Sequence, residues 1–304
     1  MRVIVIGGTG HIGGHLVPRL IEAGHDVTVA TRGRRPRPDG KAWEQAKLVK
    51  LPADDPVAAL AELPCDALID IVQADATALY EALRGKCRHF IWCGSVWMLG
   101  PPTTVPAPEV RVGPALSEPY ERRMDELCGL QRRCRRDGVA FTAILPPNIC
   151  GPGKVPLEMR GGRDVEAHRA MARGEPVKLF RGCNALIGPC DAQDVAEGFA
   201  LALEKPDPAA GEFFNVGSAY ALTAAQMVQL FSKIYGVAIP IEWVSYEEFA
   251  TRVMPDRGAR NHFLFHMCPD ISKARRKLAY EPRHTPEQSM ARAVEWMKGQ
   301  ALMG

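Results

Sequence analysis

The feature that most constrains this chain is a glycine-rich segment directly after its first apolar run. Residues 2–6 are rich in β-branched side chains and read as a buried strand. The segment that follows can be aligned as G-x-x-G-x-x-G and consists of Gly7, Gly8, Thr9, Gly10, His11, Ile12 and Gly13. A helical pattern over residues 11–23 comes next. A strand, a tight turn and a helix N-terminus bring free backbone N–H groups to one point, and this arrangement predicts a dinucleotide-binding site.

The end of the second predicted strand, residues 26–31, indicates which dinucleotide binds. Arg32, Arg34 and Arg35 follow this strand, and no acidic residue stands among them. An NAD site usually carries an acid here for the ribose 2′-hydroxyl, whereas guanidinium groups match a 2′-phosphate. We therefore expect NADP(H), with NAD(H) as the alternative if these arginines form only a solvated basic loop.

Short apolar runs alternate with helical patterns along the first half of the chain. Further strands are expected at residues 48–51, 67–72, 89–93 and 139–145, and helices at 56–63, 77–84 and 120–136. Such alternation predicts an α/β fold with a Rossmann-type, doubly wound parallel sheet. We expect residues 1–150 and 185–217 to form the dinucleotide-binding domain. Residues 151–184 and 218–304 would form a smaller C-terminal α/β lobe for the substrate.

Composition argues against several other classes of protein. No apolar run reaches the roughly 18 residues that span a bilayer, and the N-terminus lacks a secretory pattern, so a cytoplasmic protein without membrane contact is expected. The nine cysteines form no C-x-x-C pair and no zinc spacing, so no metal is expected. The formal net charge of +3 is too small to predict a nucleic-acid partner. A small-molecule substrate is the expected partner.

Several further segments resemble one known family nearly end to end. They are the Gly-rich turn, residues 90–95, the run 146–153, residues 194–196, residues 213–217 and residues 270–278. Together they resemble the extended short-chain dehydrogenase/reductase family, the NAD-dependent epimerase/dehydratase group. Residues 31–34 and 261–264 are most similar to the branch that includes chloroplast stem-loop RNA-binding proteins. The resemblance also implies that Pro146 lies at the cofactor and that the protein is a homodimer.

In this family a Ser and a Tyr-x-x-x-Lys pair act on a substrate hydroxyl or carbonyl group. The resemblance assigns Ser95 as hydrogen-bond donor to the reacting oxygen and Tyr120 as the acid or base. The position of the Lys is occupied by Met124. A thioether carries no charge, so it cannot stabilise a tyrosinate whose ordinary pKa is about 10.

Three interpretations of Met124 remain open at this point. In the first, Arg123 approaches Tyr120 from the same side of the helix and stabilises the tyrosinate. In the second, another group such as Asp191, Cys93 or His168 serves as the base. In the third, catalysis is lost and the fold only binds a nucleotide.

Three residues are expected on the substrate side. Asn148 follows the strand that ends at residue 145, at the carboxyl edge where such folds bind ligands. Arg163 could hold a diphosphate or carboxylate, and Asp191 falls where relatives often carry a His near the substrate. The sequence thus predicts an NADP(H)-dependent oxidoreductase or epimerase acting at a carbinol or carbonyl carbon of a sugar-like or nucleotide-sugar substrate. The alternative is a non-catalytic NAD(P)-binding regulatory or RNA-binding protein.

Overall fold

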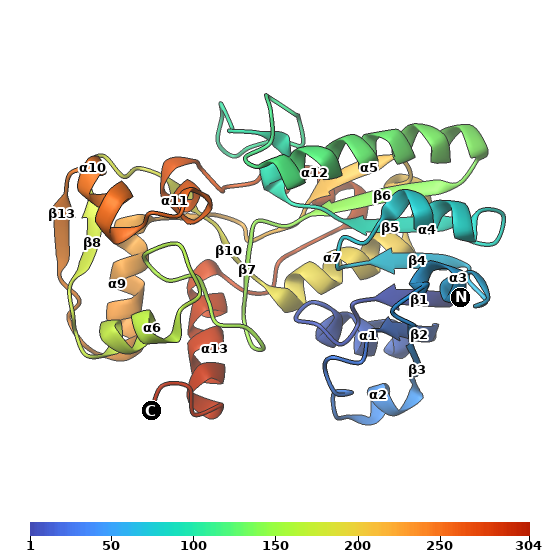
Figure 1. The fold of residues 1–304 in the computed structure, drawn as a ribbon, viewed down its shortest axis with the longest axis horizontal. Helices are drawn as coiled ribbons and strands as arrows, with labels where there is room; N and C mark the ends of the chain where they lie inside the picture. The colour runs from blue at the N-terminus through green and yellow to red at the C-terminus, as the bar shows by residue number, and fades with distance from the viewer.

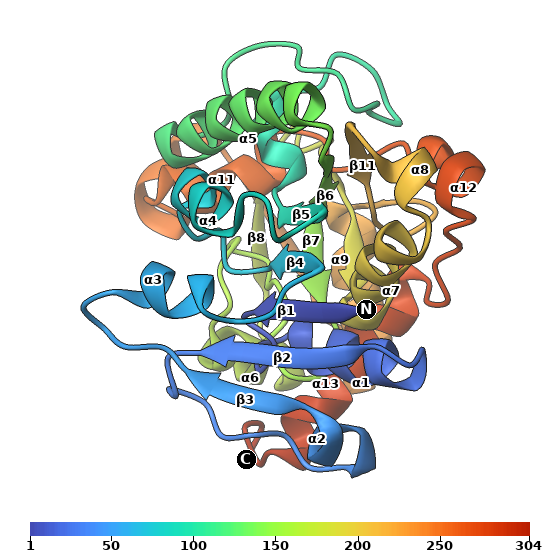
Figure 2. The same cartoon turned by 90° about the vertical axis from the view of Figure 1, so that its right-hand side faces the viewer.

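The computed structural model describes residues 1–304 and is built around one seven-stranded parallel sheet (Figures 1 and 2). The strand order is β11-β6-β5-β4-β1-β2-β3. The strands are β1 (Arg2–Ile6), β2 (Asp26–Thr31), β3 (Lys47–Lys50), β4 (Ala67–Asp70), β5 (His89–Cys93), β6 (Ala140–Leu145) and β11 (Glu212–Asn215). Val3 pairs with Val27 on one side and with Ala67 on the other. The order reverses between β1 and β4, where doubly wound sheets open a ligand crevice, and the predicted fold class is confirmed.

Helices cover both faces of this sheet, as Figure 2 shows. One face carries α1 (Gly13–Glu22), α7 (Ala192–Glu204) and α12 (Ser272–Leu278), and the other carries α3 (Pro56–Ala61), α4 (Ala76–Leu83) and α5 (Glu118–Asp137). Short helices α2 (Lys41–Gln45) and α8 (Pro206–Ala209) lie at its periphery. Side chains of β1 alternate between the two cores: Val3 and Val5 enter one, Ile4 and Ile6 the other.

A smaller lobe, on the left in Figure 1, has its own apolar core. Its helices are α6 (Val165–Ala172), α9 (Ala224–Tyr235), α10 (Tyr246–Glu248), α11 (Arg257–Leu264) and α13 (Pro286–Gly299). Its strand pairs are β8 (Val177–Phe180) with β13 (Ile241–Val244) and β9 (Leu186–Ile187) with β12 (Leu222–Thr223), while β7 (Asn148–Cys150) and β10 (Pro189–Asp191) run between the lobes. Within the C-terminal stretch assigned to the substrate lobe, helix α12 packs on α7 and β11 of the large sheet. The remaining lobe boundaries stay predictions.

Several predicted element boundaries differ from the structure by one or two residues, and two of the differences have an identifiable local cause. Strand β4 ends at Asp70, two residues early, because the Asp70 carboxylate accepts hydrogen bonds from the backbone N–H groups of Val72 and Ala74 and turns the chain. Helix α1 begins at Gly13, because the residues before it form the glycine turn. No helix combines the length and the apolar character needed to cross a membrane.

Candidate active site

The Gly-rich turn packs so closely on itself that side chains are excluded. Gly7 has a φ of +89°, a conformation that favours glycine. A Cβ on Gly13 would lie 2.4 Å from the carbonyl oxygens of Gly7 and Gly8, so the first turn of α1 rests directly on the loop. No side chain caps this helix and no acid lies in its first turn. The positive end of the helix is therefore free for an anion, and the residues fit a bound diphosphate.

The three arginines after β2 are all exposed on the loop beside this turn. Arg32, Arg34 and Arg35 form no ion pair with a carboxylate. The backbone N–H of Gly33 donates to the Thr31 hydroxyl over 3.1 Å, which shapes the turn between them. Their assignment to a 2′-phosphate remains a prediction.

Ser95 and Tyr120 line the same cavity, of about 510 Å³, at the carboxyl edge of the sheet. Ser95 follows β5 and accepts a hydrogen bond from the Trp97 N–H at the start of a 3₁₀ helix, Val96–Leu99. Tyr120 lies in the first turn of α5, just after Pro119. Burial raises the pKa of Tyr120, and a hydrogen bond from the Ser95 hydroxyl opposes part of that rise. Tyr120 is therefore a protonated phenol at neutral pH, suited to donate a proton.

Met124 lies outside this cavity. Its side chain is only 6% exposed and belongs to the core beneath α5, together with Leu127 and Trp92. The position of the family's lysine is thus part of the packed interior. No cation on α5 lines the cavity beside Tyr120.

Arg123 does not make the predicted approach to Tyr120. Its guanidinium donates to Asp70 Oδ2 over 3.1 Å, to the Ala74 carbonyl over 2.8 Å and to Glu126 Oε2 over 2.8 Å. The physical reason is the Asp70 carboxylate, which is fully buried and needs a cation. Arg123 is a structural tie between β4 and α5.

The alternative bases differ in where they lie. Cys93 lines the cavity, but burial raises the pKa of its thiol to about 12 and keeps it protonated. His168 is buried in the small lobe, 2.8 Å from the Tyr235 hydroxyl and 3.1 Å from the Pro156 carbonyl oxygen. Neither geometry supplies a base beside Tyr120.

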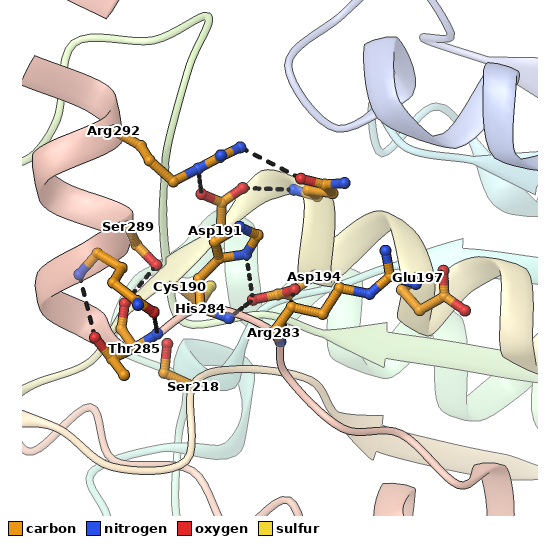
Figure 3. A network of polar contacts seen from close by, with 12 residues as sticks. Cys190, Asp191, Asp194, Glu197, Ser218, Arg283, His284, Thr285, Ser289 and Arg292 are labelled. Atoms are coloured by element: carbon orange, nitrogen blue, oxygen red, sulfur yellow. Dashed lines mark hydrogen bonds and ion pairs between the residues drawn. The ribbon is translucent and has the colours of Figure 1, made fainter. Parts of the chain in front are cut away.

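Asp191, predicted on the substrate side, lies in a different network (Figure 3). Its carboxylate accepts from Arg292 Nε over 2.9 Å and from the backbone N–H of Gln193, and so caps α7. The side chain is fully buried and does not line the cavity. Asp191 therefore joins α7 to α13, because a buried carboxylate at a helix N-terminus is stabilised by the N–H groups and by a paired cation.

Asn148, Arg163 and Pro146 all line the cavity, and their contacts with substrate or cofactor remain predictions. Arg163 donates to Asn148 Oδ1 over 2.9 Å and to the carbonyl oxygens of Ile149 and Val155 over 2.8 and 2.7 Å. Asn148 Nδ2 is buried without a partner. A buried amide N–H₂ without an acceptor costs free energy, so this group fits a ligand oxygen.

The structure adds cavity residues that the sequence reasoning missed. Trp97 and His262 form an aromatic wall, their ring centroids 4.8 Å apart, and burial lowers the pKa of His262 to about 4, so its ring is neutral. Lys154 also lines the cavity, from the loop that follows β7. The signal for Lys154 was its place directly after Gly151, Pro152 and Gly153, at the end of a segment already singled out.

A glycine turn at the switch point of a doubly wound sheet, with a Ser–Tyr pair above it, defines a dinucleotide-dependent enzyme class. Residues 3–217 match the NAD dependent epimerase/dehydratase family, and the chain belongs to this family.

Among curated relatives, the 2′-dehydrokanamycin reductase of Streptomyces kanamyceticus is 38% identical over 269 residues, covering 81% of this chain and 71% of that protein. The chloroplast stem-loop binding protein of 41 kDa b from Arabidopsis thaliana is 26% identical and covers 92% of this chain and 75% of its own length. The solved UDP-glucose 4-epimerase of Thermotoga maritima superposes with a TM-score of 0.76 at 22% identity, over 99% of this chain and all of that one. This last likeness shows the fold alone.

Proposed function

We propose that this protein is an NADP(H)-dependent oxidoreductase or epimerase acting at a carbinol or carbonyl carbon of a sugar-like or nucleotide-sugar substrate, and that it works chiefly as a reductase. The observation that carries the proposal is the Ser95–Tyr120 pair in a cavity whose floor includes Ile12 of the Gly-rich turn. When bound, the dinucleotide would supply the hydride. The family and the reductase among its relatives support the same class of reaction.

The preference for reduction follows from the protonation of Tyr120. In reduction the carbonyl carbon receives hydride and the carbonyl oxygen receives a proton, so the working form of the tyrosine is the phenol. Burial raises the pKa of Tyr120, and Met124 supplies no charge to lower it. Tyr120 would donate its proton to the oxygen while Ser95 donates a hydrogen bond to the same atom, and solvent would then restore the proton.

The cavity lining also bears on the substrate. Its charged side chains are Lys154 and Arg163, and no carboxylate lines it. A substrate with several ammonium groups would find no counter-charge, whereas a neutral or anionic sugar would. Asn148 and the neutral His262 offer hydrogen bonds to sugar hydroxyls.

The test is consumption of NADPH or NADH by the purified protein with a panel of keto sugars, free and as nucleoside diphosphate esters. We expect NADPH consumption with at least one member and an alcohol as product. Interconversion of two sugar epimers without net consumption of cofactor would identify an epimerase. A protein that binds the cofactor and turns over no member of the panel would contradict the reductase proposal.

The second candidate is a non-catalytic NAD(P)-binding regulatory or RNA-binding protein, favoured by Met124 and by the name of the chloroplast relative. RNA retention with a steep salt dependence would support it, and no retention at low salt would count against it. The homodimer is a proposal from the family resemblance and is tested by the mass of the protein in solution.

A further inference from the structure

The cavity collects positive charge that the protein itself does not neutralise. Lys154 and Arg163 line it, and neither forms an ion pair with a carboxylate. Burial, together with the charges of Arg163 and Arg35, lowers the pKa of Lys154 to about 8. These like charges repel one another, so binding of an anion between Lys154 and Arg163 would be favourable.

Lys154 lines the cavity from the loop that follows β7. The loop before it crosses close to the turn: a Cβ on Gly153 would lie 3.2 Å from Cδ2 of His11. Burial lowers the pKa of His11 to about 4, and the charge of Lys154 contributes to this lowering. The His11 ring and the Lys154 ammonium group are therefore near one another. Ile12 and Lys154 line the same cavity. An anion on the helix N-terminus would therefore lie near both the backbone N–H groups of the turn and the ammonium group of Lys154.

Position 124 supplies no cation to this site, because Met124 is packed in the core and Arg123 is bound to Asp70. Lys154 is the one lysine that lines the cavity. Its ammonium group forms no ion pair with a carboxylate that would hold it elsewhere. The charge is thus available to a ligand at the cost of side-chain entropy alone.

We propose that Lys154 binds the diphosphate of the dinucleotide from above, so that the cofactor is held between the Gly-rich turn of the large domain and the first loop of the small lobe. This inference rests on the proposed function, since it presumes that a dinucleotide occupies the turn. It assigns to Lys154 a cofactor-anchoring role. Asn148 and Arg163 remain for the substrate.

The test compares Lys154→Met with the wild-type protein by calorimetric titration with NADPH, NADH and ADP-ribose. If Lys154 forms a charge-assisted hydrogen bond with the diphosphate, the Kd of Lys154→Met should be about tenfold or more above that of the wild-type protein. The factor should be similar for the three ligands, because all of them contain the diphosphate. The affinity of the variant should also fall less steeply with salt. Lys154→Arg should recover most of the affinity. Arg35→Met should affect NADPH more than NADH if it contacts the 2′-phosphate.

Lys233→Met is the matched control, because Lys233 is exposed on α9 in the small lobe and away from the cavity. It should leave all three Kd values unchanged. Unchanged ADP-ribose affinity in Lys154→Met would overturn the inference. The inference would also be overturned if Lys154→Met kept its affinity for the dinucleotides and lost affinity only for UDP, titrated into protein saturated with cofactor. Lys154 would then contact the substrate and not the cofactor. If the wild-type protein binds and uses NADPH but Lys154→Met binds it equally well, only this inference fails. If the wild-type protein binds neither dinucleotide, the proposed function itself fails.

Discussion

At the scale of single residues, Tyr120 carries the chemistry of the proposal. Replacing it with phenylalanine removes the proton donor and leaves the ring packed beside Trp97, 6.4 Å away between centroids. General acid catalysis contributes typically 10²- to 10⁴-fold, so we expect kcat of Tyr120→Phe to fall by about 10²-fold or more. The Kd for NADPH should stay within about threefold of wild type, because no charge changes. Stopped-flow rates and a binding titration on the same preparation measure both, and unchanged turnover would remove Tyr120 from the mechanism.

Restoring the family's lysine gives a prediction with a defined sign. Met124→Lys places an ammonium group one helical turn beyond Tyr120, where it would lower the pKa of the phenol and increase the fraction of tyrosinate. Oxidation of the alcohol, which needs the base, should then rise, and its pH–rate profile should move to lower pH. Because position 124 is 6% exposed, the variant should also lose several kcal/mol of stability, on the order of the cost of an unpaired buried ion.

Met124→Leu is the control for that change, since it preserves the apolar volume and should cost under about 1.5 kcal/mol. Its pH–rate profile should match that of the wild-type protein. Identical profiles for the Lys and Leu variants would show that position 124 does not influence Tyr120.

Predictions for single residues agree with the structure where the conformation depends only on neighbours in the sequence. The Gly-rich segment forms a tight turn because its neighbours in sequence are also its neighbours in space. Arg123 illustrates the opposite case: spacing on α5 places it near Tyr120, but a buried carboxylate 53 positions earlier holds its guanidinium. Asp191 was predicted beside the substrate for the same reason, and His262 was not predicted at the cavity at all. Their partners, Arg292 and Trp97, are distant in the sequence.

At the scale of elements, the Asp70–Arg123 pair fixes α5 to β4 and so positions Tyr120. Burial raises the pKa of Asp70, and the charge of Arg123 opposes that rise. Arg123→Met leaves this carboxylate without its cation, and loss of one partner of a buried pair costs about 3–5 kcal/mol. We expect the free energy of unfolding in urea to drop by about that amount.

Arg122→Met is the matched control on the neighbouring residue. Arg122 pairs with Glu118 on the exposed face of the same helix, and such surface pairs contribute at most about 1 kcal/mol. Equal stabilities for the two variants would contradict a tie between β4 and α5. The double variant Asp70→Asn, Arg123→Met should recover part of the loss, because no unpaired charge remains.

Elements with a clear period were predictable, and short irregular ones were not. Strands β1, β2 and β5 coincide with the predicted ranges, since their runs are apolar on both faces as in buried parallel strands. The two- and three-residue strands β7, β9, β10 and β12 were not predicted. Segments of that length carry no periodicity, and contacts between the lobes determine their pairing.

At the scale of the whole molecule, both lobes contain histidines that are buried in the neutral form. His89 is the first residue of β5 in the large sheet, with Nε2 2.9 Å from the hydroxyl of Thr142 on β6, and His168 lies in the small lobe. Burial lowers the pKa of each to about 4, from an ordinary value of 6.5. Below pH 6.5 the unfolded chain therefore binds protons that the folded protein cannot. Stability from these groups is complete above that pH and is lost as the pH falls toward 4.

The size of this effect predicts how the folded state responds to mild acid. One pKa unit corresponds to about 1.4 kcal/mol, so each of the two histidines should cost about 2 kcal/mol between pH 6.5 and pH 5. We expect these two histidines to account for about 4 kcal/mol of the fall in the free energy of unfolding in urea over that interval, before most carboxylates titrate. His11 and His262, whose pKa values burial also lowers to about 4, add to that fall. His168→Gln removes one titrating group and keeps a side chain that can hydrogen-bond Tyr235. As the pH falls from 6.5 to 5, the wild-type protein loses about 2 kcal/mol that the variant does not lose, so the difference between their free energies of unfolding should narrow by about that amount. Stability curves that run parallel over this pH range would mean that His168 binds its proton equally in the folded and unfolded chain, and the small lobe would then open to water well before the molecule unfolds.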